Sequence, residues 1–409
     1  MPSTAHPLAA TAAGEQDDLL FAALELSLSR WVVVASAPGE GKVSRHTLPA
    51  CDGPALLALL DELRRRAERR CRRSVAVVTI QEAGRDGFWL HRLLEAHGVR
   101  SHVVDAASVA VSRRSRRAKT DRIDAEGLLR ALMAFARGER QVCSMLRPPS
   151  REAEDARRLT REREALLAER VRHTNRIKGL LATQGVFGFE PTWQARRVRL
   201  EALRTPQGHE LPPRLKAETL RQIERLELIL RQITEVEAAR DAALAAERQT
   251  APVAAAPAPE ADATPVALPA DEGAGARLMR LKGIGPETAS VLRLEAFQRS
   301  FGNRREVAAY AGLAPTPWQS GGLDTEQGIS KAGNARLRRA MIQLAWFWLR
   351  NQPQSELSTW YRERVREGRG RIKRIAIVAL ARKLLVALWR FVTQGLVPSG
   401  AELKPAKAA

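Results

Sequence analysis

The stretch from residue 19 to residue 136 alternates between short apolar runs and helical patterns, and this alternation constrains the fold more than any other feature. β-branched apolar runs are typical of buried strands, whereas leucines that recur every three or four residues indicate an amphipathic helix. Strands that alternate with helices predict an α/β domain whose sheet is parallel in part. We expect strands at 31–35, 44–48, 75–80 and 101–104, with the first two as a hairpin, and helices at 54–70 and 87–97.

The rest of the chain is predominantly helical, and a segment that cannot fold on its own interrupts it. Residues 251–273 are rich in Ala and Pro and contain no Lys or Arg, which predicts a linker. The charged stretches 150–181 and 213–248 predict an antiparallel coiled-coil pair, and a solvated helical spacer fits the same pattern. The expected organisation is a disordered leader (1–18), an α/β domain (19–149), a helical coiled-coil arm (150–250), the linker (251–273), a mostly helical tail domain (274–399) and a short tail (400–409).

The charge balance points to a polyanionic partner. The chain has 67 Lys and Arg residues against 46 Asp and Glu residues, which gives a formal net charge of +21. Such a surplus repels itself unless a polyanion is nearby, so nucleic acid is the expected partner. A basic protein that is merely soluble is the alternative.

Cysteine usage and hydropathy favour a cytoplasmic protein that does not enter a membrane. Cys51, Cys71 and Cys143 have neither zinc-ligand spacing nor the number needed for a disulfide framework. The leader lacks the basic start of a signal peptide. The most apolar stretch, 375–391, is interrupted by Arg and Lys at helical spacing, which predicts an amphipathic helix rather than a membrane span.

Four acidic residues of the α/β domain are candidate metal ligands. Glu25 lies in an apolar context, where an acid is costly to bury unless it is paired or bound to a metal. Glu82 follows a predicted strand at its carboxyl end, where sites of α/β proteins usually lie. Asp121 and Asp124 are spaced to share one face at the start of a helix. Such carboxylates suit Mg²⁺, and two metal ions about 3.5–4 Å apart could clamp a phosphodiester.

Each acid also has a structural interpretation. Glu25 could pair with a local Arg at a strand edge, and Asp121 and Asp124 could simply favour a helix dipole. A neighbouring run of basic residues supports the metal-site interpretation, because it would bring DNA phosphates to the same place. This run comprises Arg113, Arg114, Arg116, Arg117 and Lys119.

The tail domain contains two short motifs of interest. Gly283-Ile284-Gly285-Pro286 predicts a tight turn into a helix that starts at Pro286, and it resembles the helix-hairpin-helix motif, which grips the DNA backbone through Gly283 and Gly285. An ordinary glycine-containing turn is the alternative. Ser320, next to two glycines, is by itself more typical of a turn residue than of a nucleophile. The candidate phosphate contacts that follow it are Lys331, Arg336, Arg338 and Arg339.

Taken in order, these motifs resemble the DEDD-type bacterial insertion-sequence transposases of the insertion-sequence-110 family. The resemblance covers nearly the whole chain, from Leu19 to about Leu396. The matching segments are 82–84 before 89–90, 119–125, 283–286, 310–313, 320–321 and 330–334. It implies a ribonuclease-H-like domain of Holliday-junction-resolvase type in the first half and a second transposase domain in the tail.

The resemblance also implies roles for individual residues. Glu82, Asp121 and Asp124 match the second, third and fourth members of the family's acidic tetrad, which binds Mg²⁺. At the first position the family has Asp, followed by a Ser-Lys pair, whereas this chain has Glu25, and Leu28 replaces the Lys after Ser27. Ser320 matches the serine that the family joins covalently to DNA, which replaces its interpretation as a turn residue.

The resemblance implies DNA partners at element ends and target, a structured non-coding guide RNA, and homodimers that pair into tetramers. In such assemblies the carboxylate domain of one subunit would meet the serine domain of another. The predicted function is therefore DNA transposition through a serine–DNA intermediate. One alternative is a metal-dependent, structure-specific DNA junction nuclease in which Ser320 is idle. Another is an inactive nucleic-acid-binding protein, for which the Glu25 departure is the argument.

Overall fold

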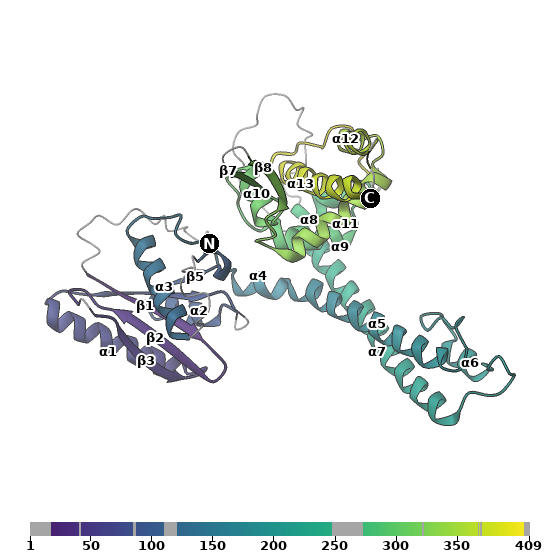
Figure 1. Cartoon of the computed structure of the whole chain (residues 1–409), viewed down its shortest axis with the longest axis horizontal. Helices are drawn as coiled ribbons and strands as arrows, with labels where there is room; N and C mark the ends of the chain where they lie inside the picture. The colour runs from purple at the N-terminus through teal and green to yellow at the C-terminus, as the bar shows by residue number, and fades with distance from the viewer. Residues whose placement is uncertain are drawn as a thin grey trace. The chain divides into compact units, whose positions relative to one another are not determined.

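The computed structural model describes residues 18–40, 42–84, 87–109, 121–247, 273–320, 323–366, 368 and 370–404. For residues 107, 121, 122, 317–320 and 323–327 the backbone alone is described. The chain divides into two compact units, Met1–Ser150 and Arg151–Ala409, and each is described by itself (Figure 1). Apart from Asp18 and Gly273, the predicted leader and linker lie outside the described residues.

The first unit is built on a six-stranded mixed sheet. Its strand order is β3-β2-β1-β4-β5-β6, with β1 parallel to β4, β4 parallel to β5, and the other pairs antiparallel. The expected hairpin and the partly parallel sheet are confirmed. The pattern predicts neither β1 nor β6. A continuous apolar run such as that of β1 cannot be told from a buried helix by periodicity alone, and β6 has only two residues. The strands are β1 (Leu19–Leu26), β2 (Arg30–Ser36), β3 (Ser44–Pro49), β4 (Ala76–Glu82), β5 (Arg100–Val104) and β6 (Met145–Leu146).

Helices cover both faces of this sheet. Strand side chains alternate between faces, so Leu20, Ala22 and Leu24 pack against one set of helices and Phe21 and Ala23 against another. The first set is α1 (Gly53–Cys71) and α2 (Trp89–Ala96), and the opposite face is covered by α3 (Asp121–Ala136). A short 3₁₀ turn, η2 (Ala106–Ser108), follows β5.

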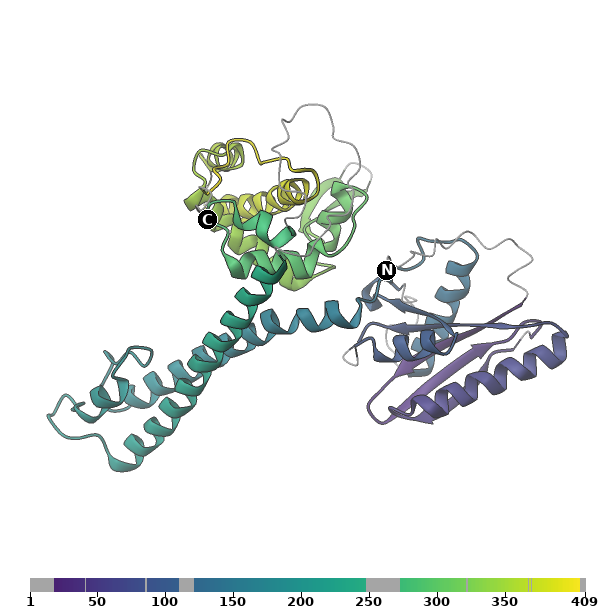
Figure 2. The ribbon, with the colours of Figure 1, turned by 180° about the vertical axis from the view of Figure 1, so that it is seen from behind.

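The second unit begins with the helical arm, whose two long helices run side by side in both views (Figure 2). They are antiparallel, as the sequence predicts. Arg163 Nε donates to Glu237 at 2.6 Å, whereas Arg176 Nη2, further along α5, donates to the earlier Glu218 at 2.7 Å. The arm consists of α4 (Arg151–Ala156), α5 (Arg158–Ala182), α6 (Arg196–Glu201) and α7 (Pro213–Glu247).

The remainder of the second unit is mostly helical, as expected. Its core is formed largely by α11 and α13, through fully buried residues such as Trp348, Leu384 and Phe391. The elements are α8 (Ala274–Met279), α9 (Pro286–Leu292), the π-helix η4 (Arg293–Phe297), α10 (Arg304–Tyr310), β7 (Pro315–Ser320), β8 (Leu323–Ile329), α11 (Ala335–Asn351), α12 (Glu356–Val365) and α13 (Gly370–Gln394). Within the described residues, no helix has both the length and the apolarity needed to span a membrane.

Candidate functional site

Two of the predicted acids lie at the carboxyl edge of the sheet on neighbouring parallel strands. Glu25 is on β1 and Glu82 is the last residue of β4. The strand register pairs Leu24 with Gln81, so the next residue on each strand is one of the two acids. Because side chains alternate along a strand, Glu25 lies on the same face as Ala23 and Glu82 on the same face as Ile80, so both acids are on the side of the sheet that α3 covers. The fold brings Glu25 and Glu82 together although 56 positions separate them in the sequence.

These two carboxylates line one cavity of about 310 Å³. Both side chains are half-buried. Gln81 also lines the cavity and is only 1% exposed, and its Oε1 accepts no hydrogen bond from any residue that the structure describes. By the same alternation the Gln81 side chain lies on the face of the sheet opposite to that of the two acids, so its oxygen does not join theirs. The carboxylate oxygens of Glu25 and Glu82 are donors that a hard divalent cation prefers.

The other two predicted acids lie on the helix that covers this face of the sheet. The helix begins at Asp121, as predicted, and Asp124 immediately precedes Ala125, which is fully buried against the sheet. The side chain of Asp124 is half-buried, whereas that of Asp121 is not described. Among the described side chains, no three acidic, His or Cys residues come close enough to hold a metal ion. Glu25 and Glu82 are thus brought together, and Asp124 does not complete a three-ligand group with them.

The basic residues predicted to bring DNA to this site fall outside the described part of the first unit. They are Arg113, Arg114, Arg116, Arg117 and Lys119, all within residues 110–120. Their predicted role in phosphate binding therefore stays a prediction.

The glycine motif of the tail forms a turn between α8 and α9, and α9 begins at Pro286 as predicted. Gly283 has φ +88°, and a Cβ added to it would lie 2.7 Å from Cβ of Asn351, so the turn requires glycine here. The turn is anchored by Gln352, whose Nε2 donates to the carbonyl of Lys282 at 2.9 Å. α8 and α9 flank this turn, and its assignment as a helix-hairpin-helix motif stays a prediction.

Ser320 ends a strand rather than lying in a loop. It is the last residue of β7, its backbone is paired with that of Leu323 on β8, and residues 321–322 between the strands are not described. Sequence reasoning did not predict these strands, because Pro315 and Pro317 argue against a strand. A two-stranded sheet tolerates these prolines, because each strand has one edge without a partner and the proline nitrogen, which cannot donate, can face that edge. Ser320 therefore lies at the end of β7, next to the residues that connect the two strands of the hairpin.

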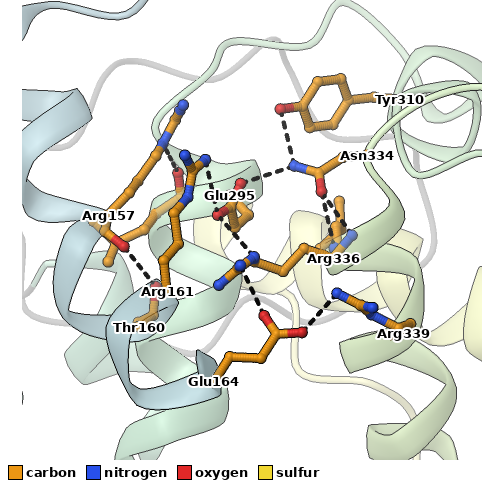
Figure 3. Close-up of polar contacts among 11 residues, drawn as sticks. Arg157, Thr160, Arg161, Glu164, Glu295, Tyr310, Asn334, Arg336 and Arg339 are labelled. Atoms are coloured by element: carbon orange, nitrogen blue, oxygen red, sulfur yellow. Dashed lines mark hydrogen bonds and ion pairs between the residues drawn. The ribbon is translucent and has the colours of Figure 1, made fainter. Parts of the chain in front are cut away.

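A buried acid that the sequence did not single out connects the arm to the tail (Figure 3). Glu295, on the π-helix η4, is 2% exposed. Its Oε2 accepts a hydrogen bond from Asn334 Nδ2 at 2.9 Å, and its Oε1 lies 3.4 Å from Arg161 Nη2 and 3.8 Å from Arg336 Nε. Asn334 also caps α11 by accepting from the backbone N–H groups of residues 336 and 337. A buried Glu within an apolar helical run is the one sequence signal that could have identified this network.

Three of the four predicted phosphate contacts of the tail have partners within the second unit. Arg336 and Arg339 form ion pairs with Glu164 of α5, at 2.8 and 2.7 Å (Figure 3). Arg338 donates to the carbonyl of Lys331 at 2.9 Å. Lys331 itself has a positive φ of 56°. Their role as nucleic-acid contacts stays a prediction, and any such contact would compete with these intramolecular ones.

An α/β unit whose sheet edge carries carboxylates, followed by a strongly basic helical unit, is typical of enzymes that act on nucleic acid. Comparison with known families agrees. A model described as the transposase IS116/IS110/IS902 family matches residues 275–359, which include Gly283, Gly285 and Ser320. A second transposase model, for the DEDD domain of IS110 elements, matches residues 28–184 and so begins just after Glu25. The chain belongs to the IS110 family of transposases.

Individual relatives support this assignment over the whole length. A Sinorhizobium fredii protein named "Putative transposase y4rJ" is 53% identical over 401 residues, which cover 98% of each chain. The transposase for insertion sequence element IS1328 of Yersinia enterocolitica is 29% identical over 68% of this chain and 73% of its own length. The transposase for insertion sequence element IS1111A of Coxiella burnetii is 26% identical over 78% of each chain.

Proposed function

We propose that this transposase cuts and rejoins DNA with Mg²⁺ held by Glu25, Glu82, Asp121 and Asp124 and with Ser320 as nucleophile. The observation that carries the proposal is the pairing of Glu25 and Glu82 in one cavity, at the carboxyl ends of adjacent parallel strands on the α3 face. The mixed sheet with acids at this edge supports a resolvase-type, ribonuclease-H-like domain. The α8–turn–α9 arrangement likewise supports a helix-hairpin-helix contact to the DNA backbone.

The proposed division of work follows from residue chemistry. A divalent cation, when bound, would stabilise the negative charge on the phosphate and on the leaving oxygen. Glu25 and Glu82 are attached to paired strands, so their oxygens are held in place before the substrate arrives. Asp121 and Asp124, in the first turn of α3, would complete the oxygen ligands. The extra methylene of Glu25, relative to Asp, still leaves a carboxylate within the same cavity.

Strand exchange would proceed by two balanced displacements at phosphorus. In the first, a bond forms between Ser320 Oγ and phosphorus while the bond from phosphorus to one deoxyribose oxygen breaks. The serine hydroxyl loses a proton and the leaving oxygen gains one. In the second, a deoxyribose hydroxyl attacks the same phosphorus, and Ser320 regains its proton. Because one phosphodiester is exchanged for another, no external energy source is needed.

Single substitutions separate this proposal from its alternatives. Supercoiled DNA that carries the ends of the element is incubated with the purified full-length protein, Mg²⁺ and the transcript of the non-coding DNA beside the gene, and nicked, linear and joined products are quantified. We expect Ser320→Ala to abolish cutting and joining, while Ser300→Ala, which removes an exposed hydroxyl elsewhere in the same unit, leaves both unchanged. Cutting that persists in Ser320→Ala supports the junction-nuclease alternative. An Asp124→Asn variant as active as the wild type contradicts the proposed metal ligation by Asp124. A wild type that binds this DNA but never cuts it supports the inactive nucleic-acid-binding alternative.

We further infer that the chain works as a homodimer that pairs into a tetramer and is guided by a structured RNA. The end of the arm supports self-association, because Phe187, Trp193 and Val198 are 80, 57 and 70% exposed there. The net charge of +21 supports a second polyanion besides DNA. Light scattering of the wild type and of a Phe187→Ser variant tests the first inference. Activity with and without the transcript of the non-coding DNA beside the gene tests the second.

A further inference from the structure

A basic groove in the second unit has no role in the function proposed above. Its walls are α10, α12, α13 and the segments that flank the β7–β8 hairpin, and its volume is about 1260 Å³. Nine of its lining side chains are Arg or Lys and one, Glu356, is acidic. None of these nine apart from Lys331 was expected from the sequence to bind nucleic acid. Such an excess of one charge in a concave surface attracts a polyanion.

The cations of the groove form a track along α13. Arg371, Arg374 and Arg382 are exposed, and they recur at intervals close to whole helical turns, so they share one face of the helix. Arg390 continues the same lining, about 28 Å along the helix from Arg371. Among the residues that the structure describes, no carboxylate pairs with Arg371, Arg374 or Arg382. No described residue therefore neutralises these three charges, in contrast to those of Arg336 and Arg339.

Apolar side chains lie between these cations. Ile375 is 57% exposed, and Val378, Val386 and Trp360 line the same groove. The ammonium group of Lys383 lies 4.8 Å from the ring centroid of Trp360, which places a cation over an aromatic face. A DNA duplex presents phosphates outward and keeps its bases stacked, so it could not use an apolar floor. An unpaired strand offers both phosphates for the rim and base faces for the floor.

The groove also reaches the hairpin that carries Ser320. Pro315 and Ile329, which pair at the base of β7 and β8, line it together with Lys331. A strand that lies in the groove would thus meet the hairpin whose other end carries the proposed nucleophile. We propose that this groove binds an unpaired segment of the DNA strand that is being cut. The identity of the strand as DNA rests on the proposed function, whereas the preference for a single strand rests on the groove itself.

The proposal is tested by binding of a labelled 15-nucleotide oligo(dT) to the full-length protein, measured by fluorescence anisotropy as a function of salt. The double variant Arg374→Gln/Arg382→Gln removes two track charges. Its matched control, Arg225→Gln/Arg231→Gln, removes two exposed charges from α7 of the arm. Loss of two phosphate contacts lowers the salt slope by about 1.4 and weakens binding about 25-fold at 0.1 M salt, because each contact to a single strand contributes about 0.7 to the slope.

We expect this loss in the groove variant and less than a twofold change in the control. Trp360→Leu keeps an apolar side chain but removes the aromatic face, and it should weaken oligo(dT) binding several-fold with little change in the salt slope. Equal losses in the groove variant and its control overturn the proposal. A loss in the groove variant that is larger for a 15-base-pair duplex, or for oligo(rU), than for oligo(dT) also overturns it. Ser320→Ala should bind oligo(dT) like the wild type, so a failed nucleophile and a failed groove give different results.

Discussion

Removing the charge of Glu295 should loosen the junction between the arm and the tail of the second unit. In Glu295→Gln the side chain keeps its shape and can still accept the hydrogen bond from Asn334, but its two ion pairs disappear. Those pairs join it to Arg161 on α5 and to Arg336 on α11, at 3.4 and 3.8 Å. The substitution therefore tests whether this buried carboxylate connects the two parts of the unit (Figure 3).

The expected magnitude follows from the exposure of the partners. Breaking a buried ion pair costs about 3–5 kcal/mol when the remaining charge is left buried and alone. Here the Arg161 side chain is 48% exposed, and Arg336, 25% exposed, keeps an ion pair with Glu164 at 2.8 Å. Solvent therefore screens part of the loss. The cost should approach that of one charge-assisted hydrogen bond, so the free energy of unfolding falls by about 2 kcal/mol.

Calorimetry of the full-length protein measures this cost as a shift in the melting of the second unit. For a unit of this size, about 2 kcal/mol corresponds to a decrease in Tm of about 4–8 °C. Glu235→Gln is the matched control, because it removes the same charge from an exposed site on α7 and should change stability by less than about 0.5 kcal/mol. Hydrogen exchange should also accelerate at the start of α11. A Tm for Glu295→Gln within 1 °C of the control would refute the reasoning.

Two further predictions concern the turn of the tail and the acid stability of the first unit. Gly283→Ala should lower the free energy of unfolding by about 2–3 kcal/mol, because its positive φ and the contact with Asn351 both oppose a Cβ, whereas Gly285→Ala, with open space around it, should cost under 1 kcal/mol in the same denaturant titration. Burial, helped by the charge of Arg100, lowers the pKa of His102 below its ordinary value of 6.5. Below pH 6.5 the unfolded chain therefore binds a proton at His102 more readily than the folded chain does. The contribution of His102 to the free energy of unfolding is fully present above pH 6.5 and declines as the pH falls below that value. The Tm of the first unit should fall between about pH 7.5 and 5.5, and it should fall less in His102→Gln; equal slopes would contradict this.

Sequence patterns predicted the parts of the structure that depend on local periodicity. The strand predicted over 75–80 is β4, which extends to Glu82, and the helices expected to start at Asp121 and at Pro286 begin at those residues. The antiparallel arm followed from the charge pattern of residues 150–181 and from apolar residues at helical spacing in residues 213–248. The candidate acids could be named because an acid beside a buried strand is costly unless it has a partner. Their approach to one another depended on the register of β1 and β4, which no local pattern contains.

The remaining features arise from contacts between distant segments. Pro315 and Pro317 made the strand that ends at Ser320 unpredictable from the sequence, because proline is usually absent from central strands. Glu295 acquires its partners only when α5 and α11 meet around it. In the sequence, the cations of α13 only interrupt an apolar helix. Their position in the same groove as Trp360 depends on the packing of α12 beside α13, which the sequence pattern does not contain. Long-range packing, rather than propensity, decided each of these cases.

The covalent attachment of DNA to Ser320 is the central claim, and mass spectrometry can detect it directly. The protein is incubated with element-end DNA, Mg²⁺ and the transcript of the non-coding DNA beside the gene. It is then digested with a protease and a nuclease, and the peptide that contains Ser320 is searched for an attached nucleotide. We predict this adduct in the wild type and its loss in Glu82→Gln, in Asp124→Asn and on chelation of Mg²⁺. DNA cleavage without any adduct on Ser320, or an adduct that persists in both carboxylate variants, would contradict the account.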